Sequence, residues 1–110
     1  MQINEYQGLA GRTINNKLSL QEVERHALYG LCGEVGEIHS LFQKRFQGHD
    51  FKASDLRKEI GDVCWMIAEL CTAHGWSMDE ICAENIEKLK ARFPDGFSEE
   101  RSVNREKYGV

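Results

Sequence analysis

Apolar residues recur along most of this chain at steps of three and four, the period of an amphipathic α-helix. One apolar stripe runs through residues 20–46 and a second through residues 54–75. The alternating pattern of a half-buried strand is absent, and Pro94 is the only proline. The pattern therefore predicts an all-α protein whose chain is free to be helical almost throughout.

Capping residues set the expected boundaries of these helices. Ser19 is placed to cap the 20–46 helix, and Ser77 begins a capping box before a helix that continues to about Phe93. The 54–75 segment ends at Gly75, a residue suited to the left-handed position after a helix. A shorter helix from Ile3 to about Ile14 is expected at the start of the chain.

The connections between these four helices are short, which favours an antiparallel four-helix bundle. Residues 1–110 are long enough for one hydrophobic core, so we expect a single helical domain. The tail from residue 95 onward is polar, and its pattern predicts irregular structure.

Composition narrows the class of protein. The formal net charge of −4 argues against non-specific binding to nucleic acid. No apolar run is long enough for a membrane span, and the N-terminus lacks a signal-peptide pattern, so a cytoplasmic location is expected. The four cysteines form no C-x-x-C pair and are interpreted as core thiols in a reducing compartment: Cys32, Cys64, Cys71 and Cys82.

Two acidic pairs carry the candidate chemistry: Glu34 with Glu37, and Glu59 with Asp62. Each pair is three residues apart and therefore projects from nearly one helical face. Both pairs lie off the centre of their own apolar stripe by a similar angle in the same rotational sense. Two antiparallel helices packed stripe to stripe would bring such pairs to the same edge, so we expect the four carboxylates to meet there.

Four converging carboxylates would repel one another unless a cation neutralised them. Oxygen-only ligands suit Mg²⁺, with Mn²⁺ as an alternative, and a di-iron site would require Glu-x-x-His, which this chain lacks. The competing interpretation is a set of surface acids paired with lysines such as Lys44 or Lys58. Embedded glycines favour the metal site, because each is costly in a helix and would let a helix or ligand approach: Gly33, Gly36 and Gly61.

The segments around the acidic pairs, 30–37 and 58–65, resemble the paired E-x-x-E and E-x-x-D motif of MazG-like all-α nucleoside triphosphate pyrophosphohydrolases. A third segment, 85–98, is similar to the helix that follows in that family. The resemblance extends from about Tyr6 to Arg105 and rests on all three motifs in order.

The resemblance implies a four-helix core assembled as a homodimer or homotetramer, and Mg²⁺-dependent hydrolysis of a nucleoside triphosphate to the monophosphate and pyrophosphate. By position it implies that Glu34, Glu37, Glu59 and Asp62 are the metal ligands. Water would attack the α-phosphorus, and Glu34 or Glu37 would take its proton.

The resemblance also implies substrate contacts from Asn85, Lys88 and Arg92, which share one helix face. Three further side chains are weaker candidates for the substrate. Lys44 lies on the same helix as Glu37 and is placed to reach a triphosphate, although a salt bridge explains it equally well. Trp65 follows Asp62 by one turn and is a candidate for stacking on a base, and Arg105 would have to fold back from the tail.

Two other functions remain open at this point. The bundle could be a helical interaction module that uses its acidic edge to bind a partner. It could also be a pyrophosphohydrolase that acts on a specialised nucleotide, since no pattern in the chain identifies the base.

Overall fold

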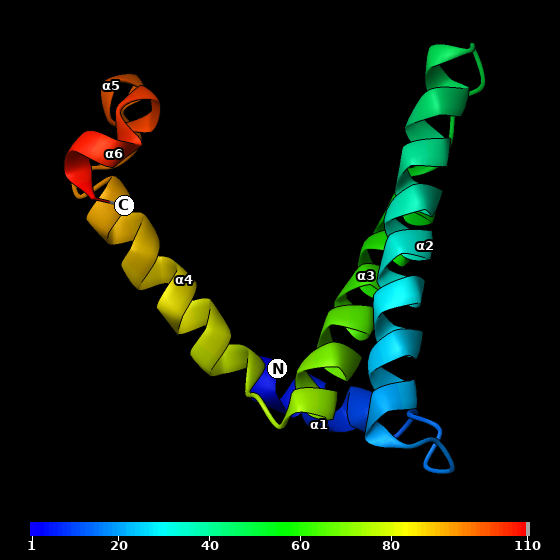
Figure 1. Ribbon diagram of the computed structural model, residues 1–110. Coiled ribbons are helices and arrows are strands. Elements are labelled where there is room, and N and C mark those ends of the chain that lie inside the picture. Colours follow the sequence, from blue (N-terminus) through cyan, green and yellow to red (C-terminus); the bar gives the residue numbers. More distant parts are fainter. Residues whose placement is uncertain (110) are drawn as a thin grey trace. The chain divides into compact units, whose positions relative to one another are not determined.

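The computed structural model describes residues 1–109, which are predominantly helical (Figure 1). Among these residues the only strand-like pairing is an isolated bridge between Pro94 and Gly96. The predicted all-α fold class is therefore confirmed, and each of the four expected helices forms. The contacts within the chain divide it into two compact units, Met1–Ser77 and Met78–Val110, which are described separately below.

The first unit contains α1 (Ile3–Gly11), α2 (Leu20–Phe46) and α3 (Ala53–His74). Helices α2 and α3 lie side by side and antiparallel, joined by residues 47–52 (Figure 1). Helix α1 packs against α3, where the Gln7 amide donates to the Thr72 hydroxyl at 3.2 Å and to the Trp76 carbonyl at 2.8 Å. The α2–α3 pair is the frame on which the acidic residues are placed.

Local capping explains where α2 and α3 begin and end. Ser19 accepts a hydrogen bond from the Glu22 amide, and the Glu22 carboxylate accepts one from the Ser19 amide, which completes the capping box expected at this end. At the end of α3, Gly75 has a φ of 71° and takes the left-handed conformation that glycine adopts without strain. The boundaries predicted for α2 are confirmed, and α3 begins one residue before the predicted range.

Helix α1 ends three residues earlier than its apolar pattern predicts, at Gly11 rather than Ile14. The Thr13 hydroxyl donates to the Ala10 carbonyl at 2.6 Å and competes with the backbone for that acceptor. The Leu18 amide then donates a hydrogen bond to the Asn15 carbonyl and closes a turn. The Asn15 side chain accepts a further hydrogen bond from the Lys17 amide at 3.0 Å. Residues 12–19 therefore form a connection with its own internal hydrogen bonds.

The core of the first unit is small and lies where α2 faces α3. Its buried apolar side chains are Val23 and Ala27 from α2, and Met66, Ala68 and Cys71 from α3. The closest approach is at Gly30, where an added Cβ would overlap the Met66 thioether. The end of the Met66 side chain occupies the volume of a Cβ at this position, so an alanine here would force that side chain to move.

The glycines inside the acidic motifs do not have this role. No other part of the described chain lies within 4 Å of a Cβ built at Gly33, Gly36 or Gly61. Within the first unit no other helix approaches the backbone at these glycines, and the approach of a ligand there stays a prediction. The tight packing occurs one turn earlier, at Gly30.

The cysteines also differ from the expectation of core thiols. No disulfide joins these four cysteines, and only Cys71 is buried, whereas Cys32, Cys64 and Cys82 are exposed. Small side chains such as Ala27 and Ala68 fill the line of closest contact between α2 and α3. The three exposed cysteines do not contribute to this core.

The second unit contains α4 (Met78–Arg92), α5 (Glu99–Val103) and α6 (Arg105–Tyr108). The prediction of an irregular tail is wrong. Ser98 caps α5 by accepting from the Arg101 amide, and the Arg101 guanidinium donates to the Arg92 carbonyl at 2.6 Å and the Ala91 carbonyl at 3.2 Å. These bonds satisfy carbonyls at the end of α4 that have no partner within the helix.

Candidate active site

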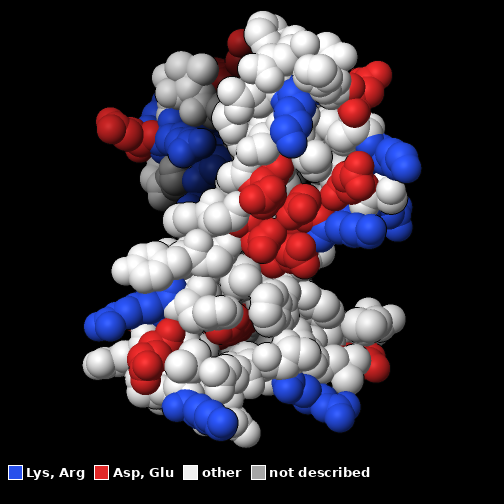
Figure 2. Space-filling view, turned by 90° about the vertical axis from the view of Figure 1, so that its right-hand side faces the viewer, with Lys and Arg blue, Asp and Glu red and all other residues white. Residues whose placement is uncertain are grey.

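Three of the four predicted carboxylates meet on the α2–α3 pair. One carboxylate oxygen from each of Glu34, Glu59 and Asp62 lies within 4.8 Å of the other two. Glu34 comes from α2 and the other two residues come from α3, so the group depends on the antiparallel packing of these helices. Figure 2 shows acidic side chains gathered on the face formed by α2 and α3.

The group carries a strong local excess of negative charge. Burial raises the pKa of Glu34, and a hydrogen bond with Glu59 together with the charges of Asp62, Glu59 and Glu37 raises it further. Within residues 1–109, none of the three clustered acids forms an ion pair with a lysine or arginine. The interpretation that lysines neutralise these acids is therefore not supported by the geometry of the described residues.

The donor set fits a hard divalent cation. Three carboxylate oxygens converge, and Glu59 Oε2 is buried without a hydrogen-bond partner in the described chain. A buried unpaired carboxylate oxygen is costly, and a bound cation would remove that cost. Oxygen ligands alone favour Mg²⁺, Mn²⁺ or Ca²⁺ over zinc or copper, which prefer nitrogen or sulfur.

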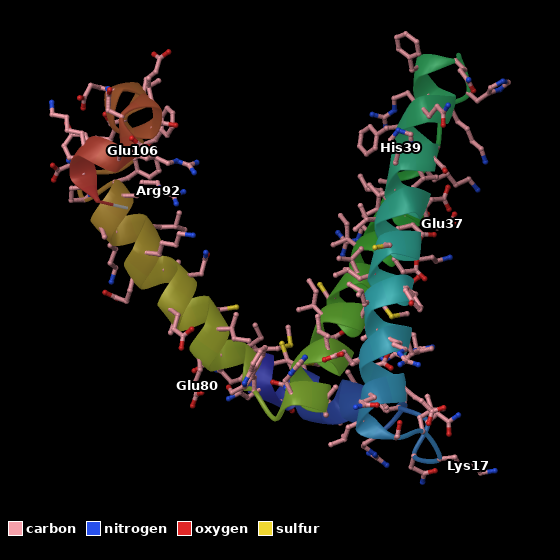
Figure 3. The ribbon with its side chains drawn as sticks, in the orientation of Figure 1. Lys17, Glu37, His39, Glu80, Arg92 and Glu106 are labelled. Carbon is pink, nitrogen blue, oxygen red and sulfur yellow. The ribbon has the colours of Figure 1, made fainter. Side chains whose placement is uncertain are left out.

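The remaining candidates on α2 lie outside this group. Glu37 is exposed one turn beyond Glu34, and its carboxylate is not among the converging oxygens (Figure 3). Lys44 is exposed ten residues beyond Glu34, roughly 15 Å along the helix axis.

Three candidates belong to α4 and one belongs to α6. Asn85 and Lys88 are exposed on α4, and Arg92 is its last residue (Figure 3). The Arg92 Nε atom is buried without a hydrogen-bond partner among the described residues. Arg105 is exposed at the start of α6. All four side chains lie in the second unit.

Trp65 is half-buried on α3 and already has a polar partner. Its indole N–H donates to the Thr13 hydroxyl at 2.8 Å, and its ring packs edge-on against His26 with the ring centroids 6.3 Å apart. The indole is thus fixed against the connection that precedes α2.

Sequence reasoning missed one polar residue on α3. Glu69 is only 2 % exposed, and its Oε1 lies 2.7 Å from His26 Nδ1. The sequence does carry a signal, because Glu69 interrupts the apolar run from Val63 to Cys71 at a core position. A carboxylate there needs partners, and the histidine on α2 supplies one.

None of the helices formed by residues 1–109 is long and apolar enough to cross a membrane. The chain is an all-helical domain with converging carboxylates. Residues 21–97 match the family model of the MazG nucleotide pyrophosphohydrolase domain. The chain therefore belongs to the MazG nucleotide pyrophosphohydrolase family.

One curated relative agrees with this assignment. The chain is 31% identical over 81 residues to the Gene 37 protein of Mycobacterium phage L5, and the alignment covers 69% of this chain and 71% of the phage protein. No solved structure matches the chain significantly. The matched segment includes both acidic motifs and α4, so family membership extends over both units.

Proposed function

We propose that this protein is a Mg²⁺-dependent nucleoside triphosphate pyrophosphohydrolase that releases a nucleoside monophosphate and pyrophosphate. The observation that carries the proposal is the convergence of Glu34, Glu59 and Asp62 from two helices in a chain of this family. The three residues would hold the cation, and Glu37 would join them or act on the attacking water. Mn²⁺ is the alternative cation.

The charges of the site determine what each part contributes. When bound, a divalent cation neutralises the triphosphate and makes water more acidic. By holding the cation, the carboxylates would keep the α-phosphorus at the α2–α3 edge. Glu34 or Glu37 takes the proton of the attacking water, and Glu37 is the less crowded of the two because its carboxylate lies outside the converging group.

The substrate needs positive charge as well as metal. We assign this role to cations that lie outside the acidic group, where they compensate for charge on the departing pyrophosphate. Asn85 would add a neutral hydrogen bond, and Trp65 would contact the base. The cations in this assignment are Lys44, Lys88, Arg92 and Arg105.

Pyrophosphate release from the eight common ribo- and deoxyribonucleoside triphosphates tests the reaction. We expect monophosphate and pyrophosphate, separated by anion-exchange chromatography, in the presence of Mg²⁺ and none in EDTA. Glu59→Gln should abolish turnover, while Glu24→Gln, a matched change on α2, should leave it intact. If no nucleotide yields pyrophosphate, or if Glu59→Gln stays fully active, the proposal is wrong.

An apolar face on the first unit favours assembly with a second copy. Leu28, Val35 and Phe42 are 45–51% exposed and recur every seven residues along α2, and Ile60 and Ile67 repeat the spacing on α3. A heptad of exposed apolar residues is typical of a helix that packs against another helix. We propose a homodimer or homotetramer, which light scattering coupled to size-exclusion chromatography would establish.

The same face supports the second candidate function, a helical interaction module. That alternative predicts binding of a protein partner without Mg²⁺-dependent turnover. The pyrophosphate assay distinguishes the two functions, since a module without catalytic activity would release no product under any metal condition.

A further inference from the structure

A small cavity lies beside the acidic group in the first unit. Its volume is about 160 Å³, and it is formed by the 12–19 connection together with α2 and α3. A cavity of about this size is enough to admit a benzene ring, and it is too small for a whole nucleotide. Its polar walls are supplied by His26, Trp65 and Glu69, with Thr13 and Asn15 from the connection.

The Glu69 carboxylate is the most unusual group in these walls. Glu69 is 2 % exposed, and Oε1 is 2.7 Å from His26 Nδ1. Its second oxygen, Oε2, is buried and has no hydrogen-bond partner among the described residues. An unpaired acceptor of this kind is rare in folded proteins and calls for a donor. Because Glu69 is one of the residues that line the cavity, a ligand in the cavity is a candidate donor.

The aromatic wall is held in place independently of any ligand. The Trp65 indole N–H donates a hydrogen bond to the Thr13 hydroxyl oxygen. The Thr13 hydroxyl in turn donates its own hydrogen bond to the Ala10 carbonyl. The indole and the connection are thereby linked to the end of α1. A flat ligand that entered the cavity would meet an indole of fixed position, which lowers the entropic cost of stacking.

The cavity lies on the same face of α3 as the carboxylates of the acidic group. Glu69 follows Asp62 by seven residues, so both project from the same face of α3 about two turns, or roughly 10 Å, apart. Trp65 lies between them, one turn beyond Asp62. A ligand whose phosphate is held at the carboxylates would have a sugar over this interval and its base at the cavity.

We infer that this cavity binds the base of the substrate and that the unpaired oxygen of Glu69 selects a base with an exocyclic amine, such as cytosine. This inference rests on the proposed function. The amine of cytosine donates to a carboxylate. Uracil and thymine present a carbonyl oxygen at the same place, which the unpaired oxygen repels. Because Oε2 is closed off from solvent, the 12–19 connection must shift for the amine to reach it.

Glu69→Gln is the sharpest test, because the amide keeps the size of the side chain and adds a donor that suits a carbonyl. Wild-type protein should favour dCTP over dUTP in kcat/KM by about tenfold or more, as expected for a hydrogen bond to a charged group. Glu69→Gln should remove or reverse that preference. Glu24→Gln is the matched control, since Glu24 also bonds a histidine, His74, at 2.7 Å but lies outside the cavity.

A binding measurement keeps the test independent of turnover. The Trp65 indole N–H resonance, assigned with Trp76→Phe, is followed by NMR during titration with dCMP or dUMP without metal. We expect dCMP to shift it more strongly than dUMP in the wild type, and Glu69→Gln to lose this difference. Leu18→Phe, which narrows the cavity without changing Glu69, should weaken the response to both nucleotides.

The outcomes separate this inference from the proposed function. If triphosphates are hydrolysed but dCTP and dUTP are equivalent, or if Glu69→Gln leaves their ratio unchanged, the inference is wrong and the function stands. If no triphosphate is hydrolysed, the function fails and the NMR titration decides the inference. Equal shifts with dCMP and dUMP, or no shift with either, would overturn it.

Discussion

Replacing Glu34 by glutamine should stabilise the metal-free protein and weaken its response to Mg²⁺. One oxygen of Glu34 lies within 4.8 Å of an oxygen of Glu59 and of Asp62. Like charges at that separation repel by about 0.9 kcal/mol in a water-like dielectric, the appropriate limit because the cluster is partly exposed. Two pairs give a gain of roughly 2 kcal/mol, and partial protonation of Glu34 lowers it.

Thermal unfolding followed by circular dichroism measures both effects. In EDTA the midpoint of Glu34→Gln should exceed that of the wild type, by roughly 4 °C for each kcal/mol in a domain of this size. Mg²⁺ at about 100 times its dissociation constant should stabilise the wild type by about 2.7 kcal/mol, and the variant by much less. Glu37→Gln, outside the converging group, should give the smaller gain in EDTA.

The gain should also depend on pH in a defined direction. The pKa of Glu34 is raised above its ordinary value of 4.5, so the native state holds its proton more tightly than the unfolded chain. Stability from this group is therefore present at low pH and is lost as pH rises through the raised pKa. The advantage of Glu34→Gln should grow over the same interval. A variant that is no more stable than the wild type in EDTA at pH 7, or that responds fully to Mg²⁺, would refute this reasoning.

Three further predictions concern packing, capping and metal affinity. Gly30→Ala should destabilise by about 1–3 kcal/mol in chemical denaturation because its Cβ meets the Met66 thioether, whereas Gly33→Ala, where the space is open, should stabilise by roughly 1 kcal/mol; equal effects would contradict the packing. Ser19→Ala should cost about 1 kcal/mol in the same assay because it removes the cap of α2, and an unchanged midpoint would show that the capping box contributes nothing. Mg²⁺ affinity, measured by calorimetry, should begin to fall at a higher pH than for ordinary glutamates, because Glu34 must lose its proton to bind metal and its pKa is raised; an affinity that stays constant down to pH 5 would oppose this.

Much of the fold was predictable because the relevant signals are local. The boundaries of α2 follow from an apolar stripe and from a capping box whose parts are three residues apart. The tail was mispredicted because α5 and α6 are too short to show a helical period. Their signal was instead the serine at position 98, followed by two glutamates, and an arginine that reaches back to the end of α4.

For the candidate site, the sequence predicted only which residues share a helix face, because the angular position of a residue around its helix follows from its spacing. Phase brought Glu34, Glu59 and Asp62 to one edge, and the carboxylates do converge there. Phase does not determine how far each side chain extends, which is why Glu37 was expected in the group although its carboxylate lies outside it. Glu69 was missed for a different reason: its partner His26 is 43 residues away, and no local pattern links them.

The contact between Gly30 and Met66 has a consequence for the chemistry of the site. Gly30 precedes Glu34 by four residues, and Met66 follows Asp62 by four, so this contact sits about one turn from the carboxylates on both helices. The packing of the Met66 side chain against Gly30 opposes sliding of α2 along α3. A slip of one turn, about 5.4 Å, would separate Glu34 from the two acids on α3. The geometry offered to a cation is therefore set by a methionine and a missing side chain, neither of which is a ligand.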